Sequence, residues 1–303
     1  MFFVDTLEVE KRIRIMRKEL EKFGISEELR GYNWDSPPVE PIEYGVKLSV
    51  SDFCGICKTL RDIYLKYVEG LKPKPNVYML SGLAYHEVIK EALYQIKRII
   101  YQKPMNGSEI IEEMLSSDIP DTICDRLNIN NSVRENCKKL FKYIVIQCAS
   151  QVDRILAKYP YADADCIVGK ALPPIVERKV DGSLIGLSDN LSVDFFIPYN
   201  AIADLKSGEV RDQNAIALAG YALALESDEM TDVNFGFVIY LRFKNGFVNF
   251  KLKHVLMSDE LRRRFLELRD EMIELINSGR DPGRPDSCPK NCCFYGVCNE
   301  ADS

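Results

Sequence analysis

Two carboxylates and an ammonium group flank a short turn near the middle of the chain. Asp194 precedes the turn at residues 198–200, and Asp204 and Lys206 follow it. If the flanking segments form an antiparallel hairpin centred on residue 199, Asp194 and Asp204 stand directly opposite each other, with Cβ atoms about 5 Å apart. Lys206 then shares their face, because side chains two residues apart on a strand point to the same side.

This arrangement predicts metal chemistry. Two carboxylates so close repel each other unless a cation lies between them, and Mg²⁺ or Mn²⁺ prefers such oxygen ligands. A neighbouring ammonium can position a water molecule and stabilise charge that develops on a phosphate. Carboxylates and lysines at strand ends are also common as plain solvent-facing residues. Asp189, in "GLSD", is an alternative first carboxylate, although it requires a longer and differently centred turn.

The chain has only two histidines. His86 lies in "GLAYHE", one turn into a predicted helix. It gains interest because a strand carboxylate and then the D-x-K pattern come after it in the chain. His254 lies beyond the predicted hairpin without such neighbours, and we interpret it as structural.

Ten cysteines require an explanation, and six of them form two groups, in "CGIC" (54–57) and "CPKNCCFYGVC" (288–298). Of the adjacent Cys292 and Cys293 only one is expected to bind a given metal centre. The tail therefore offers three ligands, Cys288, Cys292 and Cys298. A fourth comes from "CGIC" if the two ends of the chain meet. Four thiolates suit a [4Fe–4S] cluster or structural zinc, and the spacing does not decide between them.

Hydrophobic periodicity predicts the elements that position these groups. We expect helices at 8–23, 59–68, 81–101 (capped by Ser81), 213–226 and 261–276, mostly helix at 108–160, strands within 163–208, and a hairpin about Asn245-Gly246. This order predicts an α/β fold, with a mixed sheet, flanking helices and a large helical insertion. We divide the chain into an N-terminal helical region (1–80), a core (81–278, with the insertion at about 102–162) and a cysteine-rich tail (279–303).

Composition narrows the class of protein further. The 303 residues are 46% hydrophobic with a formal net charge of -6, which argues against a broadly basic surface and still allows a local basic groove. The longest apolar run, "AIALAGYALAL", is about half the roughly 20 residues of a membrane span. The first residues lack the pattern of a secretory signal. We therefore expect a cytoplasmic protein without membrane contact.

Taken together, these motifs resemble those of a known family. An N-terminal cysteine, "GxxxHE" on a helix, a strand aspartate, D-x-K and a late cysteine triple look like the RecB-like iron–sulfur nucleases of the PD-(D/E)xK (restriction-endonuclease-like) superfamily. Within it, the segments "EELRGYNWDSPP", "CKTLRDIYLKYV", "GLSDNLSVDFF" and "AGYALALE" resemble the CRISPR adaptation exonucleases of the archaeal subtype I-A branch. The resemblance covers nearly the whole chain.

The resemblance implies a role for each of these residues. His86, Asp194 and Asp204 would bind Mg²⁺ or Mn²⁺, and Lys206 would be the catalytic lysine. A [4Fe–4S] cluster joining the two ends of the chain would be held by four cysteines, namely Cys57 (with Cys54 as the possible substitute), Cys288, Cys292 and Cys298.

Two departures from the family pattern stand out. The family has a glutamine one helical turn before a tyrosine on the helix after D-x-K; here Tyr221 matches, but Ala217 takes the place of the glutamine, and Gln213 lies a further turn back. Gln213 and Tyr221 are thus candidate DNA contacts. The second departure is that Asp204, with a shorter side chain, stands where the family usually has a glutamate.

The resemblance implies metal-dependent exonuclease activity on DNA, with single-stranded ends as substrate, in the trimming of DNA fragments before spacer integration. CRISPR integrase proteins would be partners, and the chain could form a homo-oligomer. Two alternatives stay open: a nuclease fold that has lost activity and serves as a scaffold of the adaptation complex, and a zinc-bound nucleic-acid-binding module.

Overall fold

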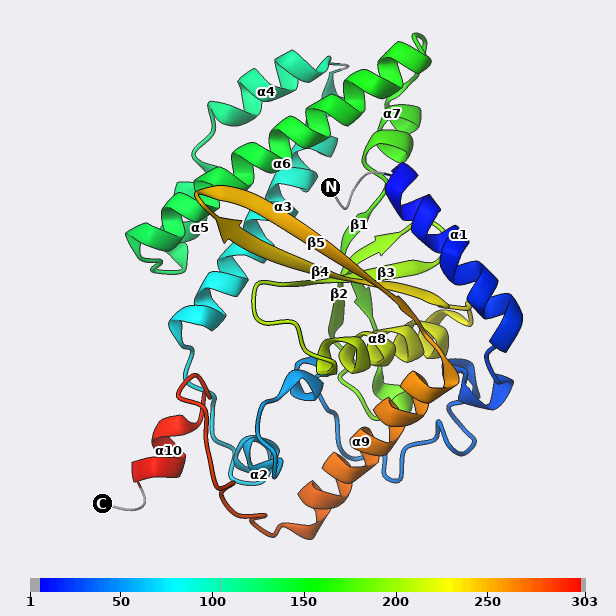
Figure 1. The fold of residues 1–303 in the computed structure, drawn as a ribbon, viewed down its shortest axis with the longest axis vertical. Coiled ribbons are helices and arrows are strands. Elements are labelled where there is room, and N and C mark those ends of the chain that lie inside the picture. The colour runs from blue at the N-terminus through cyan, green and yellow to red at the C-terminus, as the bar shows by residue number, and fades with distance from the viewer. Residues whose placement is uncertain (1–5, 104, 301–303) are drawn as a thin grey trace.

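The centre of the fold is a five-stranded mixed sheet. The computed structural model describes residues 6–103 and 105–300. The strands follow one another in the order β1-β2-β3-β4-β5, and only β3 and β4 run parallel (Figure 1). Their bounds are β1 Ile175–Val180, β2 Leu191–Ile197, β3 Ala201–Lys206, β4 Phe235–Lys244 and β5 Phe247–Leu256. The predicted α/β class is confirmed.

Both predicted hairpins are present. The pairs Phe195↔Ala203 and Ile197↔Ala201 centre the β2–β3 hairpin on Tyr199, as predicted. Its turn uses left-handed backbone at Tyr199 (φ 69°) and Asn200 (φ 49°). The β4–β5 hairpin turns through residues 245–246, both with positive φ, which is typical of tight hairpin turns with Asn-Gly.

Helices cover both faces of the sheet and bury two separate hydrophobic clusters. One face packs against α1 (Thr6–Phe23), α3 (Val77–Gln102) and the helices that lie between α3 and β1 in the chain. The other face packs against α8 (Gln213–Glu229) and α9 (Asp259–Ser278). Figure 1 shows the two groups on opposite sides of the strands. Because α8 is apolar on nearly all sides, it is buried between the sheet and α9.

Four helices separate α3 from β1, in the place of the predicted insertion. They are α4 (Gly107–Leu115), α5 (Ile119–Arg126), α6 (Asn131–Lys158) and α7 (Ala164–Ala171). The sequence prediction was wrong for α7, which we expected to be strand. Asp163 caps this helix by accepting a hydrogen bond from the Cys166 N–H at 2.8 Å, and this local signal was missed.

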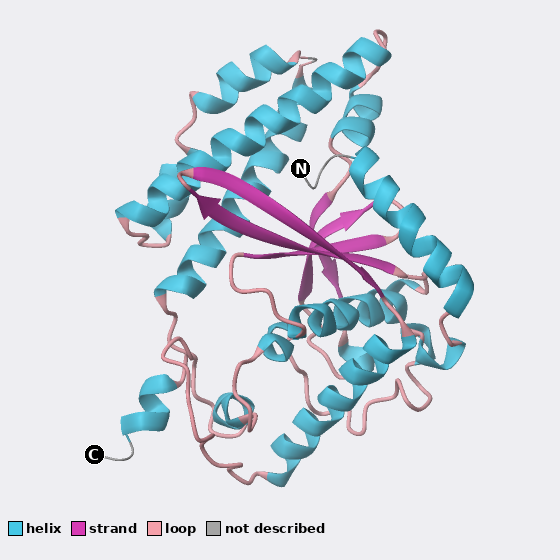
Figure 2. Cartoon of the chain, viewed as in Figure 1, coloured by secondary structure: helices cyan, strands magenta, loops and turns pink. Residues whose placement is uncertain are grey.

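The segment before α3 meets the C-terminal tail at one end of the molecule (Figure 1). Helix α2 (Arg61–Tyr67) and helix α10 (Tyr295–Glu300) share a small apolar cluster, and long loops surround them (Figure 2). Arg61 forms an ion pair with Asp281 at 2.7 Å, and the Thr59 hydroxyl donates to the Gly283 carbonyl at 2.8 Å.

The start of α3 also differs from the prediction. The helix begins at Val77, four residues before the expected start, because Asn76 and not Ser81 is its cap. The Asn76 side-chain oxygen accepts from the Met79 N–H at 2.9 Å, and its amide donates to the Asn291 carbonyl in the tail at 2.9 Å. Of the helices in the described part of the chain, none has both the length and the apolar character of a membrane span.

Candidate active site

His86 and Asp194 meet at the end of β3. His86 Nδ1 lies 3.3 Å from Asp194 Oδ1, and His86 Nε2 donates to the Leu205 carbonyl at 3.0 Å. Asp194 Oδ2 in turn accepts from the Leu205 N–H at 2.7 Å. Leu205 of β3 therefore holds the imidazole from α3 and the carboxylate from β2 together.

These contacts shift both pKa values. Burial works to lower the pKa of His86, but the Asp194 charge outweighs it and raises that pKa. Burial likewise works to raise the pKa of Asp194, and His86 and the Leu205 N–H outweigh it and lower that pKa. The pair therefore favours an imidazolium beside a carboxylate.

A local irregularity in the sheet sets the position of Asp194. The β1–β2 ladder pairs Val176 with Phe195 and Arg178 with Val193, and it passes over Glu177 opposite Asp194. Glu177 has a left-handed φ of 50°. Val193 and Phe195 pack into the clusters on opposite faces of the sheet, so the strand rotates at Asp194. A regular strand, as the sequence suggested, would place them on one face.

Asp204 and Lys206 form the second half of the site. Asp204 is 4% exposed, and Lys206 Nζ lies 2.8 Å from its Oδ2. The Lys206 ammonium is therefore the partner of this buried carboxylate oxygen. Burial raises the pKa of Asp204 to about 6. Burial works to lower the pKa of Lys206, but Asp204 outweighs it and raises that pKa.

These residues fit a divalent cation in their chemistry. Two carboxylates and an imidazole are suitable donors, and the buried Asp204 is the carboxylate that lies beside the Lys206 ammonium. Across residues 6–103 and 105–300, however, no three His, Cys, Asp or Glu side chains are grouped so as to hold an ion. His86 and Asp194 instead satisfy each other and Leu205. Binding an ion here therefore requires both side chains to turn toward Asp204.

The structure places the rival carboxylate elsewhere. Asp189 is 58% exposed and forms an ion pair with Lys47 at 2.6 Å. The aspartate beside His86 is thus Asp194. His254 is exposed on β5, opposite Phe237 and away from these groups.

The two candidates on α8 differ in position. Tyr221 is half-buried, and its pKa is raised by burial and then by the charges of Asp204 and Asp194. Tyr221 therefore lies near the carboxylates. Gln213 is the exposed first residue of α8, two turns earlier, and Ala217 between them is buried.

The predicted cluster cysteines also gather in one region. Burial raises the pKa of Cys298, and Cys288 and Cys57 are close enough to raise it further. Burial raises the pKa of Cys292 to about 11, and Cys293 and Cys57 also contribute. Cys57 therefore lies with the tail thiols.

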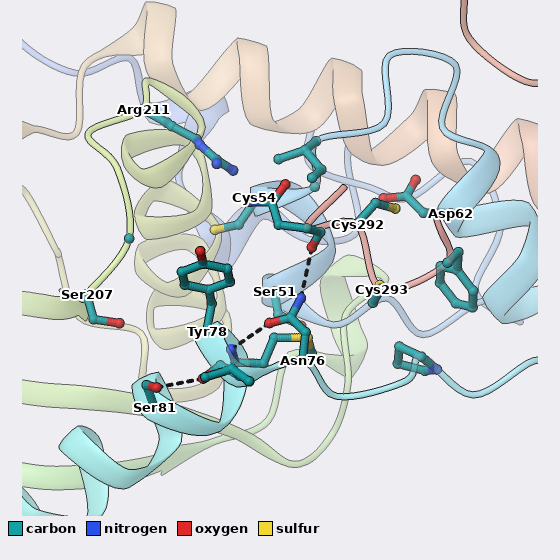
Figure 3. Close-up of a pocket in the computed structure, with 18 of the residues that line it drawn as sticks. Ser51, Cys54, Asp62, Asn76, Tyr78, Ser81, Ser207, Arg211, Cys292 and Cys293 are labelled. Atoms are coloured by element: carbon teal, nitrogen blue, oxygen red, sulfur yellow. Dashed lines mark hydrogen bonds between the residues drawn. The ribbon is translucent and has the colours of Figure 1, made fainter. Parts of the chain in front are cut away.

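Cys54 lines the same cavity as Cys292 and Cys293, with its sulfur turned away from them (Figure 3). The pKa of its thiol is raised by burial and then altered by Lys206 and Asp204, so Cys54 faces the carboxylate site. The four thiols of Cys57, Cys288, Cys292 and Cys298 are of the type that suits iron–sulfur or zinc, but among the described residues no three of them are grouped so as to hold an ion, so binding one requires these side chains to turn toward each other.

A cavity of about 730 Å³ extends from the residues next to Lys206 to the cysteines of the tail. Ser207 and Arg211 line the end next to Lys206, and Asp62, Cys292 and Cys293 line the other (Figure 3). The sequence analysis did not single out the wall residue Tyr78. The available signal was its position two helical turns before His86 on one helix face.

Comparison with known proteins identifies the family. The family model for the CRISPR-associated exonuclease Csa1 matches residues 1–301. The CRISPR-associated exonuclease Csa1 of Saccharolobus solfataricus is 33% identical over 302 residues, covering 99% of this chain and 100% of the relative. The protein of the same name from Thermoproteus tenax is 31% identical over 294 residues, covering 96% and 98%.

A solved structure of a candidate exonuclease from Eubacterium rectale aligns with a TM-score of 0.43 at 13% identity, over 82% of this chain and 87% of that one. The family resemblance expected from the sequence motifs is confirmed by the family model and by both relatives. The chain belongs to the CRISPR-associated exonuclease Csa1 family.

Proposed function

We propose that this protein is a metal-dependent DNA exonuclease that trims the ends of DNA fragments before their integration as CRISPR spacers. Its family supports an exonuclease role associated with CRISPR. The observation that carries the metal-dependent chemistry is the meeting of His86, Asp194, Asp204 and Lys206 at the end of β3, where two carboxylates lie with an imidazole and an ammonium.

His86, Asp194 and Asp204 would hold Mg²⁺ or Mn²⁺. The ion would polarise a phosphate oxygen and lower the pKa of an attacking water molecule. Lys206 orients that water and stabilises the negative charge that builds up on the phosphate. Asp204, within 2.8 Å of Lys206, keeps the ammonium charged and directed toward the site. Tyr221 closes the wall of the site on the α8 side.

The cysteines support a structural role for a [4Fe–4S] cluster. Cys57, Cys288, Cys292 and Cys298 would bind it and tie the segment before α2 to the tail. Because such a centre exists only in the folded chain, its binding free energy adds to the free energy of unfolding. DNA is the proposed substrate, and the integrase proteins of CRISPR adaptation are the proposed partners.

A second candidate function is a scaffold without activity. Ala217, which replaces the glutamine typical of the related nucleases, favours it. A nuclease assay separates the two: single-stranded DNA labelled at one end is incubated with Mn²⁺ and the purified protein, beside Lys206→Ala and Asp204→Ala. We expect cleavage by the wild type that both substitutions abolish, and unchanged cleavage by Lys47→Ala, a surface control.

Intact DNA after incubation with well-folded wild-type protein would support the scaffold. Metal analysis of the same preparation addresses the cysteines. Iron with acid-labile sulfide supports the cluster, whereas stoichiometric zinc in a colourless protein supports a zinc-bound module.

A further inference from the structure

The cavity next to Lys206 belongs to no part of the proposed cleavage chemistry. Its walls come from the 3-10 helix at Val50–Cys54, α2, the first turns of α3, the loop after β3 and the tail. Its volume of about 730 Å³ lies within the range of about 300–1,000 Å³ typical of ligand sites. It is therefore large enough to receive a part of the substrate beyond the reacting phosphate.

One face of α3 leads from the carboxylate site into this cavity. Tyr78, Gly82 and His86 recur every four residues and so share a face of the helix. His86 reaches Leu205, and a Cβ at Gly82 would lie 3.3 Å from Ser207 Oγ, so this face follows the end of β3 closely. Tyr78 continues the same line about 12 Å beyond His86 along the helix axis.

Tyr78 exposes an aromatic ring in the cavity. Its side chain is 75% exposed, and among the described residues its hydroxyl has no hydrogen-bond partner. Figure 3 shows the ring between Ser207 and Cys54, with its hydroxyl end on the side of Arg211. An exposed ring that no protein group covers is the surface on which unpaired nucleobases stack.

Of the described cations that line the cavity, Lys66, Arg242 and Arg211, the last is the one available to a ligand. Lys66 is held by Asp52 at 2.6 Å, and Arg242 donates to the Ser207 carbonyl at 2.7 Å. The guanidinium of Arg211 lies 3.7 Å from the carboxylate of Glu209, a long contact with a side chain that is 85% exposed.

The acidic residues of the wall do not oppose an anion near Arg211. Asp52 is paired with Lys66, and it also accepts from the Tyr67 hydroxyl at 2.6 Å. Asp62 lies at the far end, beside Cys292 (Figure 3). The charge at the Lys206 end thus suits a phosphate.

We propose that this cavity binds an unpaired nucleic-acid strand next to the reacting phosphate, with Tyr78 stacked on a base and Arg211 bound to a phosphate. This inference rests on the proposed function, because it places the strand beyond the cleavage site. It selects single strands, since the bases of a duplex are already stacked and paired and cannot offer a free face to Tyr78.

The test is binding without cleavage. A fluorescent single-stranded oligonucleotide is titrated in the presence of a chelator of divalent ions, with wild type, Tyr78→Ala, Tyr78→Phe and Arg211→Ala. Tyr94→Ala is the matched control, because Tyr94 is an exposed tyrosine of the same helix outside the cavity. We expect Tyr78→Ala to weaken binding by between about 5-fold and 100-fold. Tyr78→Phe and Tyr94→Ala should bind like wild type, since stacking needs the ring alone.

Arg211→Ala is expected to reduce the slope of log K against log salt concentration by about 0.7, the contribution of one phosphate of a single strand. Equal affinities of wild type and Tyr78→Ala, or an unchanged salt slope in Arg211→Ala, would overturn the inference, as would a wild type that binds no strand.

The outcome is separable from that of the cleavage assay. Binding with this pattern by a protein that fails to cut DNA with Mn²⁺ would refute the proposed nuclease and leave the strand site standing. Cleavage that Lys206→Ala abolishes, with affinity indifferent to Tyr78, would refute the strand site alone.

Discussion

A buried carboxylate at the end of α8 provides the sharpest test of how this fold is held. Glu226 has an exposed fraction of 0% and accepts hydrogen bonds from Arg262 at 2.7 and 2.8 Å and from Arg30 at 3.0 Å. It also accepts from the N–H groups of Gly31 at 2.8 Å and Val233 at 3.0 Å. This one side chain therefore joins α8, α9 and the N-terminal segment.

Glu226→Gln removes the negative charge and keeps the shape. Arg262 is fully buried and Arg30 nearly so, and both then lose their common counter-charge. Breaking a buried ion pair by changing one partner destabilises a protein by about 3–5 kcal/mol. At about 2 °C per kcal/mol for a large domain, the melting temperature should fall by about 6–10 °C. Differential scanning calorimetry at pH 7 measures this, with Asp189→Asn as the control from the exposed Lys47 ion pair.

The direction of the Glu226 pKa shift determines how this stabilisation depends on pH. Burial works to raise the pKa of Glu226, but Arg262 and the two N–H groups outweigh it and hold that pKa below its ordinary 4.5. A lowered pKa stabilises the fold above pH 4.5, and this contribution is lost as the pH falls through the native value. The gap between wild type and Glu226→Gln should therefore be full at pH 7 and should narrow below about pH 4.5. A melting temperature unchanged by the substitution at pH 7, or a gap that widens in acid, would refute the reasoning.

Three further outcomes are expected. Gly220→Val should lower the free energy of unfolding by about 1–3 kcal/mol, measured by urea unfolding, because a Cβ at residue 220 would lie 2.4 Å from the Phe265 ring; a variant as stable as wild type would contradict this packing. Cys57→Ser should lose iron in metal analysis while Cys54→Ser keeps it, and the reverse result would exchange their roles. Asn76→Ala should destabilise α3 by about 1 kcal/mol through its lost cap, with faster hydrogen exchange in its first turn, and unchanged exchange there would disprove the cap.

Local sequence was sufficient for the elements whose signals lie within a few residues. The turn at residues 198–200 fixed the β2–β3 register, because left-handed backbone at Tyr199 and Asn200 closes a tight hairpin whatever surrounds it. The apolar sequence of α8 likewise indicated a helix buried on most sides. The predicted start of α3 was four residues too late, because the cap is Asn76 and not Ser81. The Asn76 side chain caps the helix and also donates a hydrogen bond to Asn291 in the tail, and the local sequence does not show that second contact.

The chain by itself determined which residue types form the candidate site and roughly where their strands turn. Only the tertiary structure shows that Asp194 lies beside His86, whereas Asp189 pairs with Lys47, 142 residues away. It also brought Cys57 near Cys292 and Cys298 and Cys54 near Lys206 and Asp204. Such choices depend on charges and hydrogen bonds between segments far apart in the chain, and periodicity carries no information about those contacts.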